Sequence, residues 1–156
     1  MRTSAGILLF RRDSDGVRVL LAHPGGPLWA TRDDGAWSIP KGELDGGEDP
    51  LDAARREFAE ESGHPPPEGS YLDLGEVRLR SRKVVRAWAV EGDLDPATAV
   101  SSTFELEWPP ASGRTITVPE VDRLAWFRPE EAALKLSPAQ VAFVERLVKL
   151  LGSVDR

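Results

Sequence analysis

Three glutamates occupy one face of a predicted helix. Glu57, Glu60 and Glu61 are spaced i, i+3 and i+4, so their carboxylates converge if the segment is helical. Like charges at this spacing destabilise a helix by roughly 0.2–0.5 kcal/mol per pair. A hard divalent cation reverses that effect, because Mg²⁺ prefers carboxylate oxygens and bridges them to phosphate oxygens. The alternative interpretation is a solvated acidic face of an ordinary amphipathic helix.

The loop before this helix has a composition suited to binding an anion or a metal. Residues 41–48 read Lys-Gly-Glu-Leu-Asp-Gly-Gly-Glu, and the glycines allow backbone groups to approach a ligand closely. The helix is predicted to run from Pro50 to Ser62, because Asp49 can cap its first N–H groups and proline suits its first position. Gly63 is a fitting end.

Together the loop and the helix resemble the Nudix family. The Nudix box asks for Gly, five residues, Glu, seven residues, Arg-Glu, an apolar residue, any residue, Glu-Glu, any residue, Gly and an apolar residue. The matching positions are Gly42, Glu48, Arg56, Glu57, Phe58, Glu60, Glu61 and Gly63. His64 stands at the final apolar position, which is a packing site in the family. Eight matches at fixed offsets make the signal highly specific.

The resemblance implies an α/β fold, the α/β/α sandwich with a mixed sheet, formed by a single domain over residues 1–156. It also implies a bound Mg²⁺, with Mn²⁺ as an alternative ion. Glu57, Glu60 and Glu61 correspond to the family's metal ligands, and the backbone carbonyl of Lys41 is expected to be a further ligand.

Hydrolysis of a phosphoanhydride needs neutralised phosphate charge, a positioned water and a base. In the family the base is a box glutamate or a glutamate on a later loop, so the candidates are Glu57 and Glu120. Glu120 precedes Trp126 by six residues, which resembles the diadenosine polyphosphate hydrolase branch, where a glutamate at this offset binds metal. The alternative for Glu120 is an exposed loop acid. Glu48 and Arg56 are expected to hold the loop against the helix.

Candidate substrate contacts are Lys41, Gly42 and Lys83, and Arg82 is also considered for phosphate binding. Lys83 is favoured because a lysine precedes a strand tryptophan in the same branch, as Lys83 precedes Trp88 here. A solvated surface cation is the alternative for each of the basic residues.

The motifs favour a hydrolase of a nucleoside diphosphate-linked compound. Dinucleoside polyphosphates such as diadenosine tetraphosphate are placed ahead of nucleoside triphosphates. A non-catalytic nucleotide-binding regulator on the same fold is the rival of another class, although such proteins usually lose a box acid and none is lost here. An inositol pyrophosphate hydrolase would need a more basic pocket than the sequence locates.

The composition limits the partners. A chain of 156 residues with a formal net charge of −6 does not favour a long nucleic acid, which clustered cations would have to hold. RNA decapping is disfavoured for the same reason. There is no cysteine, and no apolar run approaches the length of a membrane span. A cytoplasmic protein acting on a small nucleotide is expected.

Hydrophobic periodicity and turn residues predict the strands and helices that position these residues. Residues 5–10 and 17–22 are predicted to form a hairpin, and 37–40 a short strand. Further strands are predicted at 71–80, 83–90 and 124–127, and a final helix is predicted to open at Ser137-Pro138. Residues 23–36 are expected to form a loop, and residues 92–119 a long excursion with short strands. Both are expected to shape the substrate pocket.

Overall fold

The computed structural model describes residues 2–154. Six strands form one mixed sheet in which β4, β5, β1, β2 and β8 follow one another and β3 pairs with β1; β6 and β7 form a separate two-stranded sheet. Only β1 and β5 run parallel to each other. The elements in chain order are β1 (Thr3–Asp13), β2 (Gly16–Pro24), β3 (Lys41–Glu43), α1 (Pro50–Ser62), β4 (Leu72–Arg78), β5 (Val84–Glu91), η1 (Pro96–Thr98), β6 (Thr103–Glu107), β7 (Thr115–Pro119), β8 (Val121–Phe127), α2 (Pro129–Lys135), η2 (Pro138–Gln140) and α3 (Val141–Val154).

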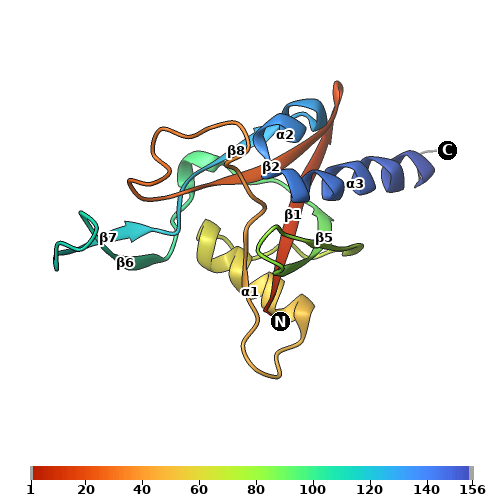
Figure 1. Cartoon of the computed structure of the whole chain (residues 1–156). Coiled ribbons are helices and arrows are strands. Elements are labelled where there is room, and N and C mark those ends of the chain that lie inside the picture. The colour runs from red at the N-terminus through yellow and green to blue at the C-terminus, as the bar shows by residue number, and fades with distance from the viewer. Residues whose placement is uncertain (1, 155–156) are drawn as a thin grey trace.

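The central strand β1 is apolar on both faces and separates two cores. Ile7 and Leu9 pack with Phe58 of α1, whereas Leu8 and Phe10 pack in the cluster that contains Phe143 of α3. This alternation is the consequence of the two-residue repeat of a strand. Helix α1 therefore covers one face of the sheet and α2 and α3 cover the other (Figure 1). The predicted α/β/α sandwich is confirmed.

Strands β1 and β2 are paired only near their turn, from Phe10 opposite Val19 to Asp13 opposite Gly16. Farther from the turn, the segment 38–43 lies between them. The Ala22 N–H donates to the Ser38 carbonyl at 2.7 Å, and the Ile7 N–H donates to the Pro40 carbonyl at 3.1 Å. We call residues 38–43 the wedge, and this segment brings β3 alongside β1 and close to α1.

The wedge requires a glycine on β1. A Cβ atom at Gly6 would lie 2.5 Å from the Pro40 carbonyl oxygen, closer than packed atoms tolerate. The strand predicted at 37–40 is wrong in position: Trp37 and Ser38 form isolated bridges, and the strand follows at Lys41–Glu43. The physical reason is that Pro40 has no N–H to donate to a ladder.

Helix α1 has the bounds that the sequence predicts. The Asp49 side chain accepts from the Asp52 N–H at 3.1 Å, and Gly63 ends the helix at a φ of 75°, where a side chain would be strained. The predicted first hairpin and the later strands are also confirmed, with small differences at their ends.

The last third of the chain differs more from the prediction. Helix α2 was not predicted, because its seven residues bury only Ala132 and leave no apolar stripe to detect. The predicted final helix begins with the short turn η2 before α3. The excursion 92–119 holds η1 and the β6–β7 hairpin, which projects away from the main sheet (Figure 1). No helix among residues 2–154 is long and apolar enough to cross a membrane.

Gln140 anchors the wedge to the helical layer. It is 2% exposed, its Oε1 accepts from the Ile39 N–H at 2.9 Å, and its Nε2 donates to the Ser38 hydroxyl at 3.0 Å. We expect Gln140→Leu to lower the free energy of unfolding by about 1–3 kcal/mol, since it leaves the buried Ile39 N–H without a partner. Chemical denaturation measures this loss. Glu145→Gln, on the exposed side of α3, is the control, and equal midpoints for the two variants would contradict the anchoring role.

Candidate active site

Glu57 and Gly42 meet where β3 crosses α1. The Glu57 side chain is 14% exposed, and a Cβ atom built on Gly42 would lie 2.0 Å from its carboxyl carbon. Only glycine lets the carboxylate reach the backbone of β3 at this point. The first glycine of the motif therefore has a steric role here: it makes room for the first acid of the Glu57, Glu60 and Glu61 set.

Glu61 is the acid most strongly affected by its surroundings. Its Oε1 accepts a hydrogen bond from the Lys41 N–H at 3.3 Å. Burial, followed by the negative charge of Glu57, raises the pKa of Glu61 to about 8. Burial also raises the pKa of Glu57, although the hydrogen bond from Arg56 opposes that shift. Burial and mutual repulsion therefore disfavour the ionised form of both neighbouring carboxyls.

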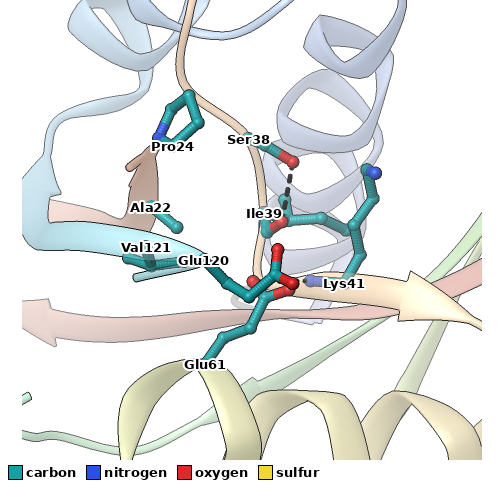
Figure 2. A pocket seen from close by; sticks show the side chains of 8 residues that line it. All are labelled: Ala22, Pro24, Ser38, Ile39, Lys41, Glu61, Glu120 and Val121. Atoms are coloured by element: carbon teal, nitrogen blue, oxygen red, sulfur yellow. Dashed lines mark hydrogen bonds between the residues drawn. The ribbon is translucent and has the colours of Figure 1, made fainter. Parts of the chain in front are cut away.

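Glu120 joins these acids from the junction of β7 and β8. Its N–H donates to the Ser102 carbonyl at 2.8 Å, and its carbonyl accepts from the Gly25 N–H at 3.1 Å. Figure 2 shows the Glu120 and Glu61 carboxylates pointing toward one another beside Lys41. The charge of Glu120 contributes to the raised pKa values of Glu57 and Glu61. The fold thus places this exposed loop acid at the same site as the helix acids.

Arg56 connects the helix to the loop. Its Nε and Nη2 donate to the two oxygens of Glu48, each at 2.9 Å, and its Nη1 donates to Glu57 at 2.8 Å and to Glu60 at 3.3 Å. The bidentate bonds from Arg56, followed by the Asp45 N–H, lower the pKa of Glu48 to about 2. Glu48 therefore stays ionised, and with Arg56 it holds the loop over the helix.

The donor set fits a hard divalent cation. No three histidine or acidic side chains among residues 2–154 are already grouped to hold an ion, and the Arg56 guanidinium lies on Glu57 and Glu60 instead. However, the site offers oxygen ligands only, which Mg²⁺ and Mn²⁺ prefer. Glu57 and Glu61 are partly buried and have raised pKa values, so a bound cation would relieve the repulsion between their carboxylates. The side chains of Glu57, Glu60, Glu61 and Glu120 would hold it. The carbonyl of Lys41 is the expected backbone ligand.

A cavity of about 530 Å³ opens over these groups. The acids line it together with Lys41, Lys83 and Ser81. A smaller cavity of about 180 Å³ shares Lys41, Glu61 and Glu120 with it and is also lined by Pro24 and Ile39 (Figure 2). The three residues predicted to contact substrate, Lys41, Gly42 and Lys83, all line the larger cavity.

Sequence reasoning missed a histidine that supports this region. His23 is fully buried; its Nδ1 lies 3.0 Å from the Asp122 carboxylate and its Nε2 lies 2.6 Å from the Arg32 carbonyl. Both ring nitrogens therefore have a polar partner within hydrogen-bond distance. Through Asp122, His23 ties β2 and the loop 25–36 to the strand that follows Glu120. No spacing rule in the sequence identifies such a pair.

Comparison with known proteins identifies the family of the chain. A model of the NUDIX domain matches residues 1–147, and the chain belongs to the Nudix family. An RNA pyrophosphohydrolase of Psychrobacter cryohalolentis is 41% identical over 76 residues, which cover 45% of this chain and 44% of that protein. The match therefore spans less than half the length of this relative.

Two solved structures resemble the whole chain. The Ap4A hydrolase of C. elegans in a binary complex has a TM-score of 0.70 at 20% identity, covering 96% of this chain and 98% of its own. The NUDIX domain of Shewanella oneidensis NrtR, complexed with ADP ribose, has a TM-score of 0.66 at 16% identity, covering 96% and 87% respectively. At these identities the likeness shows the Nudix fold.

The raised pKa of Glu61 predicts a specific dependence of stability on pH in metal-free protein. Between about pH 4.5 and about pH 8, the Glu61 carboxyl keeps its proton in the folded state and has lost it in the unfolded state. The free energy of unfolding therefore falls as the pH rises through this range. In chelator, we expect Glu61→Gln to unfold at a higher temperature than wild type at pH 8–9, by at least about 2–4 °C, the shift that 1 kcal/mol produces. The difference in unfolding temperature between Glu61→Gln and wild type should narrow toward pH 5.

Thermal unfolding across this pH range measures the effect, with Glu145→Gln as the exposed control. Added Mg²⁺ should then stabilise wild type more than Glu61→Gln. A difference in unfolding temperature that does not change with pH would contradict the assignment of Glu61 as a protonated carboxyl.

Proposed function

We propose that this protein is a Mg²⁺-dependent pyrophosphohydrolase that cleaves a phosphoanhydride bond in a nucleoside diphosphate-linked compound. The observation that carries the proposal is the convergence of Glu57, Glu61 and Glu120 on one cavity beside Lys41, with raised pKa values for the two helix acids. Perturbed carboxyls in a cleft are the usual sign of a reactive or metal-binding site.

The residues divide into those that hold the ion, those that position the acids and those that move a proton. A bound Mg²⁺ supplies charge neutralisation on the phosphate oxygens. Glu57 or Glu120 takes the proton of the attacking water, since each lines the same cavity. Glu48 and Arg56 orient Glu57 and Glu60, as outer residues orient metal ligands generally.

Dinucleoside polyphosphates such as diadenosine tetraphosphate are the preferred substrates. The position of Glu120 six residues before Trp126 favours them, and so does the likeness to the C. elegans Ap4A hydrolase over nearly the whole chain. Nucleoside triphosphates come second. We place the enzyme in the cytoplasm, where such nucleotides occur.

A second candidate is removal of pyrophosphate from the 5′ end of RNA. The 41% identity to an RNA pyrophosphohydrolase over 76 residues favours it, whereas the net charge of −6 opposes a long RNA footprint. The rival from another class is a regulator that binds a nucleotide without cleaving it. Retention of all the box acids argues against that rival.

The test is a substrate panel with Mg²⁺ that includes diadenosine tetraphosphate, nucleoside triphosphates, ADP-ribose and 5′-triphosphorylated RNA, run in H₂¹⁸O to identify the phosphorus attacked. We expect the highest kcat/KM with diadenosine tetraphosphate and no turnover in chelator. Glu60→Gln should lower kcat by about 100-fold or more because it removes an ion ligand.

Glu145→Gln is the control for this experiment, because it makes the same chemical change on the exposed side of α3. A Glu60→Gln enzyme as active as wild type would contradict the metal site. Tight nucleotide binding without any turnover would favour the regulator. Preference for the triphosphorylated RNA would replace the first candidate by the second.

A further inference from the structure

Residues 98–102, which we call the strap, run alongside the C-terminal end of α1. The Ser102 N–H donates to the Glu60 carbonyl at 2.8 Å, and the Val100 N–H donates to the Ser62 carbonyl at 2.9 Å. The contacts recur at every second residue, as they do between paired strands. The last carbonyls of a helix have no partner within the helix. The strap therefore supplies donors to two carbonyls at the end of α1.

The last two positions of the Nudix box accommodate the strap. A Cβ atom built on Gly63 would lie 2.7 Å from the Val100 carbonyl oxygen and 3.0 Å from the Val100 nitrogen. Glycine is therefore needed here for the approach of the strap as well as for the φ of 75° that ends the helix. His64, which stands where the box has an apolar residue, places its Nε2 2.8 Å from the Thr98 hydroxyl. The departure from the box thus has a polar partner in the strap.

The strap also fixes the backbone at Glu120. The Glu120 N–H donates to the Ser102 carbonyl at 2.8 Å. The Ser101 hydroxyl donates to that same carbonyl at 2.9 Å and accepts from the Val121 N–H at 3.0 Å. Ser101 is therefore linked to two consecutive N–H groups, directly to that of Val121 and through the shared carbonyl to that of Glu120.

The helix acids and the loop acid are joined through a single residue of the strap. Ser102 donates to the Glu60 carbonyl with its N–H and accepts from the Glu120 N–H with its carbonyl. All three residues line the cavity over the acids. Because backbone hydrogen bonds vary in length by only a few tenths of an ångström, these two bonds set the spacing between the backbone of α1 and that of Glu120.

This spacing matters for a shared ion. Mg²⁺ demands near-ideal octahedral geometry, so ligands from two different elements must be held in place by the residues around them. The carboxylates of Glu61 and Glu120 point toward one another (Figure 2), although 59 positions separate them in the sequence. Among the bonds that fix Glu120, those of Ser101 are the ones made by a side chain. A substitution can therefore remove them.

We propose that Ser101 is a positioning residue, whose hydroxyl holds Glu120 at the distance from the α1 acids at which they share one divalent cation. The inference rests on the proposed function, in which Glu120 and the helix acids hold the ion. It deepens that function by assigning the residue that sets their spacing.

The test is a double-mutant cycle on the affinity for Mn²⁺ alone, measured with the full chain by electron paramagnetic resonance of the free ion. The cycle comprises wild type, Ser101→Ala, Glu120→Ala and the double variant. We expect Ser101→Ala to weaken Mn²⁺ binding by about 10-fold, the effect of losing a group that orients a metal ligand. With Glu120→Ala already present, the further loss should be less than about 2-fold. An unchanged affinity, or an equal loss in both backgrounds, would overturn the proposal.

Two further variants separate positioning from packing. Ser101→Thr retains the hydroxyl and should bind Mn²⁺ within about 2-fold of wild type, whereas Ser101→Val has the same shape without the hydroxyl and should behave like Ser101→Ala. An equal loss in the threonine and valine variants would overturn the role of the hydroxyl. Ser112→Ala is the matched control, because the Ser112 hydroxyl also accepts from a backbone N–H, that of Arg114 at 3.2 Å, but lies in the exposed turn between β6 and β7.

Kinetics then distinguish the strap from the proposed function. With diadenosine tetraphosphate, Ser101→Ala should raise the Mg²⁺ concentration for half-maximal rate by about 10-fold and leave KM for the nucleotide within about 2-fold. Coupled Mn²⁺ binding in a protein that hydrolyses no compound would support the strap while the proposed function fails. Hydrolysis with the same Mg²⁺ dependence in wild type and Ser101→Ala would overturn the strap while the proposed function stands.

Discussion

The close approach of β3 to α1 is the constraint on which the site depends. It is possible because β1 and β2 separate beyond their turn and leave space for residues 38–43, and because Gly6 and Gly42 have no side chains. The same approach confines Glu57 against backbone and buries Glu61. A larger residue at Gly6 would push the segment 39–41 away from β1, and one at Gly42 would collide with the Glu57 carboxylate.

This crowding sets the electrostatics of the cavity. Arg56 donates to Glu48 and also to Glu57, but burial still raises the pKa values of Glu57 and Glu61. This cluster of carboxyls favours a bound cation, and Lys83, at the turn between β4 and β5, lines the same cavity.

Contacts distant in sequence complete the arrangement. Glu120 reaches the helix acids because β7 leads into β8, which pairs with β2, and its backbone is fixed by Ser102 and Gly25. The buried pair of His23 and Asp122 links the same strands. The β6–β7 hairpin leads into this junction and forms a separate two-stranded sheet.

Local sequence was sufficient to predict α1, its cap at Asp49 and its end at Gly63. It also predicted the shared face of Glu57, Glu60 and Glu61, because helix ends and helical spacing depend on neighbours in the chain. Motif spacing also indicated the family and singled out Glu120. Tertiary structure alone decided that Glu120 lies beside Glu61 and that α2 forms. Each of these depends on which distant segments pack together, and the free energy of that packing is not encoded in any single stretch of residues.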